Sequence, residues 1–405
     1  MSSTVAPTNP ISQRIQNLAE SATLAMAAKA REYRAQGIEV IALSLGEPDF
    51  KTPAHICEGA KKAIDEGKYF SYPPVNGYLD LREAICTKLQ RDNSIEYTPD
   101  QIVVSNGAKQ SIANAMYSLV DPGDEVIVYT PYWVSYAAII QLAEGVPVYL
   151  EGGIESDFKA TARQLEAAIT PKTKVVIYSS PSNPTGSVFN RQEMAEMAEV
   201  LARHPDIYVI ADEIYEHINY TGEHVSMASF PEMYDHTITV NGFAKGFAMT
   251  GWRVGYIAAP QWIAKACAKM QGQITSANCS IAQRAALTAL NEDLGPTFAM
   301  TAEYLRRRDL VMELLGEIPG IRTRLPQGAF YFFPDISEYF GKSDGTTTIQ
   351  NSDDLCMYIL DEAHVALVTG GAFGAPNCVR ISYAASEENL RKAISQMKEV
   401  LARLS

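Results

Sequence analysis

Along the chain, short runs of apolar residues alternate with longer segments in which apolar residues recur every three or four positions. The short runs have the length and composition of buried strands, and they cover residues 102–105, 125–129, 174–178, 208–211, 237–240 and 253–258. Segments with helical periodicity separate them, for example residues 109–119 and 192–202. Because parallel strands need a long crossover between them, this alternation predicts an α/β fold with a mainly parallel central sheet.

The pattern changes after residue 274. One long helical stretch, two strand-like runs and a final helix are expected there, at residues 280–315, 330–333, 379–382 and 387–404. We therefore expect a large α/β domain over residues 47–290 and a smaller α+β domain made of residues 1–46 and 291–405. In this division the N-terminal segment packs against the C-terminal part of the chain.

Polar residues interrupt the pattern just after four predicted strands, where ligands of open parallel sheets bind. After the strand at 102–105, Gly107, Ala108 and Lys109 begin a helix with small residues, which suits either a phosphate or an ordinary strand–helix connection. In the second such loop, Asn183 is braced by two prolines. Its amide is either held rigidly toward a ligand oxygen or is part of a simple turn.

The other two strand ends carry charged groups. Asp212 ends an apolar run expected to be fully buried, and a buried carboxylate needs a cation, either a protonated ring nitrogen or a structural partner. Lys245 follows small and apolar residues. Desolvation there would lower the amine pKa and free it as a nucleophile, although most lysines are solvated surface charges. Arg253 follows shortly after and can bind a phosphate.

Together these strand ends supply a phosphate-binding turn, an amide donor, a carboxylate and an amine at one edge of a sheet. A pyridoxal-phosphate site needs such a set, because a lysine holds the cofactor as a Schiff base and an acid pairs with its ring nitrogen. The chain resembles the class I (fold type I) aminotransferases, in the bacterial-type aspartate aminotransferase subgroup. The matching blocks run in family order over nearly the whole chain: Ser44-Leu-Gly-Glu-Pro-Asp-Phe50, Tyr72-Pro-Pro-Val-Asn-Gly77, Asn106-Gly-Ala-Lys-Gln110, Pro131-Tyr-Trp-Val-Ser-Tyr136, Ser182-Asn-Pro-Thr-Gly186, Ala211-Asp-Glu-Ile-Tyr215, Asn241-Gly-Phe-Ala-Lys-Gly-Phe-Ala-Met-Thr-Gly-Trp-Arg253 and Asn377-Cys-Val-Arg-Ile-Ser-Tyr383.

The resemblance implies a role for each matching residue around the cofactor, pyridoxal 5'-phosphate. Lys245 forms the Schiff base and carries the proton between substrate and cofactor, and Asp212 pairs with the pyridine nitrogen. Tyr215 and Asn183 hydrogen-bond the ring oxygen, and Trp133 stacks on the ring. Lys245, Asp212 and Tyr215 are the expected catalytic residues.

The phosphate is expected to bind Gly107, Ala108 and Arg253, by the same resemblance. Many relatives carry a hydroxyl residue three positions before the lysine to bind the phosphate, whereas this chain has Gly242. The phosphate must then rely on backbone donors, Arg253, Lys109 and a neighbouring subunit.

The resemblance further implies a seven-stranded central sheet and a homodimer with shared active sites, in which Tyr72 reaches the phosphate of the neighbouring subunit. Arg380 would clamp the substrate α-carboxylate with two hydrogen bonds, and Lys109 would bind the distal carboxylate of a dicarboxylic amino acid. The expected substrate contacts are Gly46, Lys109, Trp133, Asn183 and Arg380.

The substrates expected from this subgroup are small amino acids and 2-oxo acids. Aspartate with 2-oxoglutarate is the first choice, giving oxaloacetate and glutamate, and prephenate, aromatic amino acids or alanine are the alternatives. Some members of this subgroup also use prephenate, helped by a basic residue in the N-terminal segment. Residues 16–20 lack one, which argues against prephenate, although Arg14 is near.

Composition narrows the classes of function. A net charge of −13 argues against a nucleic-acid partner. The six cysteines are scattered without a Cys-x-x-Cys pair, and the histidines lack metal-ligand spacing, so we expect reduced thiols and no metal site. Residues 1–10 do not resemble a secretory signal and no run of 18 apolar residues occurs, which predicts a cytoplasmic protein without a membrane span.

Two other classes of function lack their required motifs. A dinucleotide oxidoreductase needs a Gly-x-Gly-x-x-Gly turn after a strand, and none occurs. A transcriptional regulator on this scaffold would need an added helix-turn-helix and a basic face, and the sequence predicts neither.

Overall fold

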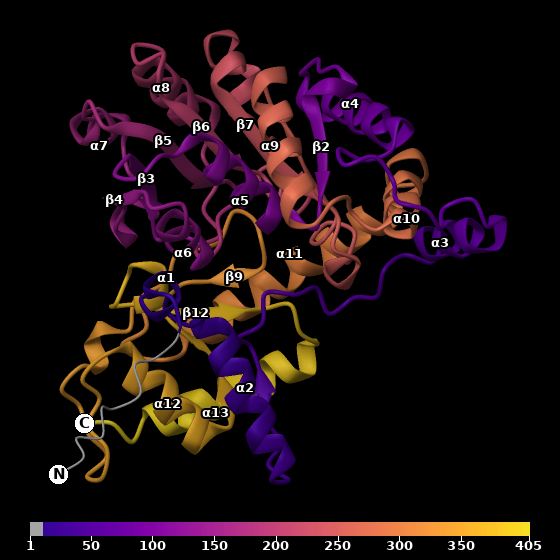
Figure 1. The fold of residues 1–405 in the computed structure, drawn as a ribbon. Coiled ribbons are helices and arrows are strands. Elements are labelled where there is room, and N and C mark those ends of the chain that lie inside the picture. Colours follow the sequence, from indigo (N-terminus) through magenta and orange to yellow (C-terminus); the bar gives the residue numbers. More distant parts are fainter. Residues whose placement is uncertain (1–10) are drawn as a thin grey trace, which may run out of the picture.

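The computed structural model describes residues 11–405, and its largest sheet has seven strands in the order β2-β8-β7-β6-β5-β3-β4 (Figure 1). The strands are β2 (Ile102–Ser105), β3 (Glu125–Thr130), β4 (Val146–Glu151), β5 (Thr173–Ser179), β6 (Tyr208–Asp212), β7 (Thr237–Gly242) and β8 (Gly255–Ala258). Only β8 in this sheet runs against its neighbours. The predicted mainly parallel, seven-stranded sheet is therefore confirmed.

Alternate residues of the central strands pack into two different cores. Val175 and Ile177 of β5 face one core with the helices α5 (Ala108–Leu119) and α9 (Gln261–Ile274). Val176 and its neighbours on β3 and β6 face the other core with α7 (Ala162–Ala168) and α8 (Arg191–Leu201). Because helices cover both faces, the middle residues of these strands are apolar at successive positions, which is why continuous apolar runs identified them.

The reversed strand β8 brings its beginning to the edge where the other strands end. Gly255 pairs with Gly242 at the end of β7 and with Ser105 at the end of β2. The prediction that this strand starts at residue 253 is wrong by two residues. Arg253 has a φ of 58° after the 3-10 helix η5 (Thr250–Trp252), and this left-handed conformation prevents it from continuing the strand.

Two further elements differ from the predicted pattern. Strand β4 had no clear apolar run because it lies at the sheet edge, where Val146 and Tyr149 are half exposed. The single helical stretch predicted at 280–315 is two helices, α10 (Ser280–Asn291) and α11 (Gly295–Gly316), with Pro296 at the start of the second. A proline fits the first turn of a helix, where its missing N–H leaves no hydrogen bond broken.

The C-terminal part contains two small sheets covered by helices. Strand β1 (Ile41–Ala42) pairs with β10 (Val365–Ala366), and a second sheet has the order β11-β12-β9, formed by β11 (Val368–Thr369), β12 (Val379–Ser382) and β9 (Tyr331–Phe332). Its helices are α2 (Ala22–Ala35), α12 (Ser352–Ala363) and α13 (Glu387–Leu401). Helix α2 and strand β1 thus pack against the C-terminal part, whereas Arg14 and Asn17 contact Glu144 and Gln141 of the large α/β part.

The predicted domain boundaries at residues 46 and 290 stay a prediction, and residues 1–10 of the predicted small domain lie outside the described residues. The remaining helices are α1 (Gln13–Gln16), α3 (Ala54–Glu66), α4 (Leu79–Asn93) and α6 (Ser135–Leu142), with 3-10 turns η1 (Pro99–Gln101), η2 (Ile154–Ser156), η3 (Met227–Ser229), η4 (Pro231–His236), η6 (Ser337–Tyr339) and η7 (Gly370–Phe373). Over residues 11–405, none of the helices combines the length and the apolar character needed to cross a membrane.

Candidate active site

The polar strand ends of the large sheet line one cleft of about 620 Å³. Nine of the residues singled out from the sequence line it: Gly46, Ala108, Lys109, Trp133, Asn183, Asp212, Tyr215, Lys245 and Arg253. Residues that were not predicted complete the lining: Leu24, Glu47, Ser179, Ile214, Ala244, Thr250 and Gly251. A cleft of this size accepts a cofactor or a small-molecule substrate.

Asp212 ends β6 as a buried carboxylate that has no cationic partner within ion-pair distance among the described residues. The hydroxyl of Tyr136 donates to its Oδ2 at 2.6 Å, and the backbone N–H of Ile214 donates to Oδ1 at 3.3 Å. Burial raises the pKa of Asp212 to about 6, against the lowering effect of these hydrogen bonds. The carboxylate is therefore ready to pair with a cation brought by a ligand.

Lys245 extends into the same cleft from the turn that follows β7. Its Nζ donates to the carbonyl oxygen of Gly46 and lies 5.6 Å from the centre of the Tyr215 ring. Burial, with a smaller contribution from Arg380, lowers the pKa of the Lys245 amine to about 8. About a tenth of the amine is then neutral and nucleophilic at pH 7, far more than for a solvated lysine.

The start of α5 and the Arg253 side chain form an anion-binding corner. Gly107 precedes the helix with a φ of 83°, and Ala108 is its first residue. Arg253 donates to the carbonyl oxygens of Thr250 and Asn106 at 2.8 and 3.1 Å, which fixes its guanidinium beside this helix start. Unpaired backbone N–H groups at a helix start and a fixed guanidinium suit a phosphate.

Glycines allow this corner to close and explain the departure at Gly242. A methyl group on Gly255 would lie 2.4 Å from the backbone nitrogen of Ala108. A methyl group on Gly242 would lie 2.7 Å from the Cα of Gly255. The β8 backbone therefore excludes any side chain at position 242, so a hydroxyl residue there would require the two strands to separate.

Arg380 on β12 lies fully buried at the other end of the site. Its guanidinium donates to Asn183 Oδ1 at 2.9 Å and to the carbonyl oxygen of Ser44 at 2.6 Å. The rings of Tyr331 and Phe373 lie 4.6 and 5.0 Å from its central carbon. Its Nε has no hydrogen-bond partner among the described residues. A rigid guanidinium with a spare donor fits a carboxylate.

Lys109 supplies a second cation in the cleft. Its Nζ lies 5.0 Å from the centre of the Trp133 ring. Burial, and then the positive charge of Arg253, lower the pKa of Lys109. Trp133 in turn packs edge-on against Tyr136, with ring centres 5.6 Å apart. The cleft thus contains a cation beside an aromatic plane, between the anion-binding corner and solvent.

Two tyrosines in the site were not assigned from the sequence. Tyr136 could have been found, because it belongs to the matching block that contains Trp133. The Tyr331 hydroxyl lies 2.7 Å from that of Tyr215, yet the two residues are far apart in the chain and no motif links them. Tyr72 is not in the cleft of its own chain, and its side chain is almost fully exposed.

The raised pKa of Asp212 has a consequence for stability that can be measured after any bound cofactor has been removed. The folded state retains the Asp212 proton between the ordinary pKa of 3.8 and about 6, so the stabilisation from this proton is lost as the pH rises through that window. Relative to Asp212→Asn, the wild-type free energy of unfolding should fall by up to about 3 kcal/mol between about pH 4 and pH 7.

Urea denaturation across this pH range measures the difference. Tyr136→Phe serves as the companion variant, because it removes the hydrogen bond that lowers the pKa of Asp212 and should extend the decline to higher pH. A wild-type minus Asp212→Asn difference that stays flat or grows with pH would contradict the assignment.

The family model described as aminotransferase class I and II matches residues 38–397. A bifunctional aspartate aminotransferase and glutamate/aspartate-prephenate aminotransferase from Petunia hybrida is 48% identical over 396 residues, which cover 96% of this chain and 82% of the relative. An aspartate/prephenate aminotransferase from Cereibacter sphaeroides is 45% identical and covers 98% of this chain and 99% of the relative.

Solved structures give the same result. The aspartate aminotransferase from Rhizobium meliloti superposes with a TM-score of 0.95 at 42% identity, over 98% of this chain and 100% of that chain. The aspartate aminotransferase from Thermus thermophilus with maleate has a TM-score of 0.91 at 42% identity, over 97% and 100% of the two chains. With a family match over most of its length and these relatives, the chain belongs to the class I and II aminotransferases.

Proposed function

We propose that this aminotransferase moves the amino group between L-aspartate and 2-oxoglutarate, giving oxaloacetate and L-glutamate, with pyridoxal 5'-phosphate bound as a Schiff base to Lys245. The observation that carries the proposal is the pairing of two groups in one cleft. Asp212 is a buried carboxylate without a cation, and Lys245 is an amine whose pKa is lowered to about 8. A cofactor with a cationic ring nitrogen and a reactive carbonyl satisfies both.

The donor groups of the cleft fit the rest of this cofactor. The start of α5 and Arg253 suit its phosphate, and the face of Trp133 suits its ring. The hydroxyl of Tyr215 and the amide of Asn183 are polar groups near Lys245 that suit its ring oxygen. When bound, pyridoxal phosphate supplies an electron-withdrawing ring that weakens the bonds at the substrate α-carbon.

Each catalytic side chain has a separate task in this proposal. Asp212 keeps a proton on the ring nitrogen, because its buried negative charge is stabilised only by a cation. Lys245, once released from the cofactor, takes the α-proton of the substrate and returns it to the cofactor side. Its lowered pKa suits this work near neutral pH, where the amine can both accept and give up a proton.

Two cations at the site support a dicarboxylic substrate. The rigidly held Arg380 can bind the α-carboxylate, and Lys109, a flexible cation in the cleft, can reach a distal carboxylate. A second carboxylate bound without a cation would lose several kcal/mol. The relatives support the same substrate class, because they are named for aspartate, and the Thermus thermophilus structure holds maleate, a dicarboxylate.

Prephenate is the second candidate substrate, because the Petunia hybrida and Cereibacter sphaeroides relatives are named for it as well as for aspartate. Prephenate also carries two carboxylates, so the same pair of cations can serve it. Arg14, the basic residue nearest the N-terminal segment in question, is an ion-pair partner of Glu144 at 2.6 Å. That contact gives Arg14 a role outside the cleft, so Lys109 remains the candidate for the distal carboxylate of either substrate.

We further propose that the enzyme works as a homodimer with shared active sites. The end of α3, the start of α4 and the segment between them expose large apolar side chains, Ile64, Phe70, Tyr72 and Leu79. Exposed apolar groups of this size are typical of a protein interface. Tyr72 on this surface would complete the phosphate site of the partner subunit. The six free cysteines are typical of a reducing compartment, which supports a cytoplasmic location.

Replacing Lys245 tests the proposed function directly. Lys245→Ala should lose the yellow colour of a lysine-linked cofactor and nearly all transamination between aspartate and 2-oxoglutarate, because Lys109, the other lysine that lines the cleft, serves the substrate or the phosphate in this proposal and not the Schiff base. Absorbance spectra and a coupled assay measure both. Lys265→Ala, which removes an exposed lysine of α9, is the control and should behave as wild type. A Lys245→Ala protein that stays yellow and active would overturn the proposal.

Replacing Lys109 separates substrate binding from phosphate binding. If Lys109 binds the distal carboxylate, kcat/KM of Lys109→Ser for aspartate should fall by about 10- to 1000-fold, from roughly 1.5–4 kcal/mol of lost charge-assisted bonding. Alanine and phenylalanine should be affected little. The panel of substrates should include prephenate, which should fall with aspartate. An equal loss for all donors, together with weaker cofactor binding, would instead assign Lys109 to the phosphate.

The shared active site can be tested with hybrid dimers. Lys245→Ala and Tyr72→Ala subunits should each be poorly active alone, whereas a hybrid of the two has one site with the Lys245 and Tyr72 of the wild type. Co-expression with two affinity tags isolates the hybrid, and its activity should exceed that of both parents. A hybrid no better than its parents, or a fully active monomer in sedimentation, would contradict the shared site.

A further inference from the structure

A buried polar network lies beside the turn that carries Asp212 and Tyr215. The Nζ of Lys88, on α4, forms an ion pair with Glu216 Oε1 and donates to Asn93 Oδ1 at 2.8 Å. The Asn93 amide then donates to Glu216 Oε2 at 3.3 Å. Lys88 is only 2% exposed, so its ammonium group is desolvated and contacts these protein groups in place of water.

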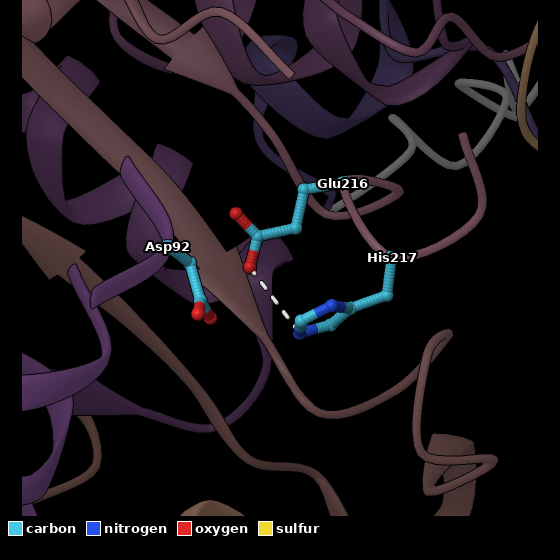
Figure 2. Close-up of side chains that lie close together, drawn as sticks. All are labelled: Asp92, Glu216 and His217. Atoms are coloured by element: carbon cyan, nitrogen blue, oxygen red, sulfur yellow. Dashed lines mark ion pairs between the residues drawn. The ribbon is translucent and has the colours of Figure 1, made fainter. Parts of the chain in front are cut away.

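Histidines extend the network along the same turn. His217 Nε2 lies 3.4 Å from Glu216 Oε1, and Figure 2 shows these two side chains next to Asp92. Glu213, fully buried, binds the hydroxyl of Ser226 at 2.6 Å and the ring of His224 at 2.9 Å. We call Lys88, Asn93, Glu213, Glu216, His217 and His224 together the Lys88–Glu216 network.

Charged neighbours counteract the effect of burial on the acids and histidines of the network. Burial opposes the charge of Glu216, but Lys88 and the neighbouring histidines lower its pKa to about 2. Burial likewise opposes the charge of His224, but Glu213 raises its pKa. The network therefore contains the opposite-charge pair of Lys88 with Glu216, and a contact of His224 with Glu213 that favours the protonated imidazole.

The acids and histidines lie close enough together to suggest a metal site. The ligand atoms of Asp92, Glu216 and His217 lie within 4.8 Å of one another, as do those of Glu213, Glu216 and His224. However, the Lys88 ammonium already contacts Glu216, the residue that the two groups share. A built-in cation at this point satisfies the carboxylates without a metal ion.

The network contacts both segments that carry proposed catalytic residues, the turn that contains Asp212 and Tyr215 and the segment that contains Lys245. Glu213 and Glu216 belong to the turn that begins at Asp212 and contains Tyr215. A methyl group on Gly246, next to Lys245, would lie 2.9 Å from the Cβ of His217. The His217 ring also packs edge-on against Phe247, with ring centres 5.3 Å apart. Moving Glu216 or His217 would therefore move the surface on which the Lys245 segment rests.

We propose that the Lys88–Glu216 network positions the Asp212–His217 turn against the Lys245 segment, so that the carboxylate, the phenol and the amine of the site meet a bound cofactor in one fixed geometry. The proposal rests on the proposed function for the roles of Asp212, Tyr215 and Lys245. The network residues themselves are positioning residues, because Lys88, Glu216 and His217 are not among the residues that line the cleft.

The sharpest test removes both charges of the central pair. Single replacements leave one buried charge unpaired and destabilise the fold, whereas Lys88→Met/Glu216→Leu removes both and should fold with a melting temperature near that of wild type. In the cofactor-loaded double variant, the pH at which the visible spectrum titrates should shift by about half a unit or more, because the charges around Lys245 move. The kcat should fall by about 10- to 100-fold.

Two comparison variants separate positioning from plain stability. Arg322→Met/Asp335→Leu removes a different ion pair, with a distance of 2.7 Å, and should leave the spectral titration unchanged even where the melting temperature falls. Asn93→Ala keeps both charges of the network and loses only the bridging amide, so it should shift spectrum and kcat in the same direction by a smaller amount. It also provides a readout if the double variant does not fold.

The proposal would be overturned if the folded double variant kept the spectral titration and the kcat of the wild type. If the double variant does not fold, unchanged values in Asn93→Ala would have the same meaning. The network would then have a purely structural role. Failure of the proposed function would look different. The wild-type protein itself would then show no lysine-linked cofactor spectrum and no transamination that depends on Lys245.

Discussion

The site depends on a single electrostatic constraint, the burial of the Asp212 carboxylate with no cation of residues 11–405 within ion-pair distance. Such a group costs free energy in the folded protein unless it takes up a proton or a positive partner, and its raised pKa of about 6 reflects that cost. The hydroxyl of Tyr136 and one backbone N–H hold the carboxylate without neutralising it. A cationic ring nitrogen brought by a ligand would therefore be stabilised here more than in water, as an acid that keeps such a ring protonated requires.

The topology of the sheet brings the other groups to this carboxylate. Parallel strands β5, β6 and β7 end at one edge and deliver Asn183, Asp212 and Lys245 there. The reversal of β8 adds Arg253, which would otherwise lie at the opposite edge. Gly255 lets the backbone of β8 approach the start of α5, and the same close packing excludes a side chain at Gly242. One reversed strand thus explains both the anion-binding corner and the missing hydroxyl.

Sequence reasoning recovered what depends on local pattern and missed what depends on distant contacts. Continuous apolar runs and the polar residues that end them were enough to predict the sheet and the residues at the strand ends. Strand β4 was missed because an edge strand is half exposed and lacks that pattern. Tyr331 was missed because its contacts with Tyr215 and Arg380 join segments far apart in the chain. Lys88 lies in a helix rich in charged residues, and only the fold shows that its charge is buried.

Arg380 joins the large sheet to the C-terminal part of the chain. It lies on β12 of a separate small sheet, yet it donates to Asn183 after β5 and to Ser44 in the N-terminal segment. A guanidinium held from both sides cannot follow a substrate, so a carboxylate must come to it in one orientation. The two ends of the Asn183 amide therefore face different partners. Its oxygen accepts a hydrogen bond from Arg380, and its N–H₂ group remains free to donate to a ligand in the cleft. Binding at the carboxylate end is thus coupled through one amide to the ring end of the site, and each end restrains the position of the other.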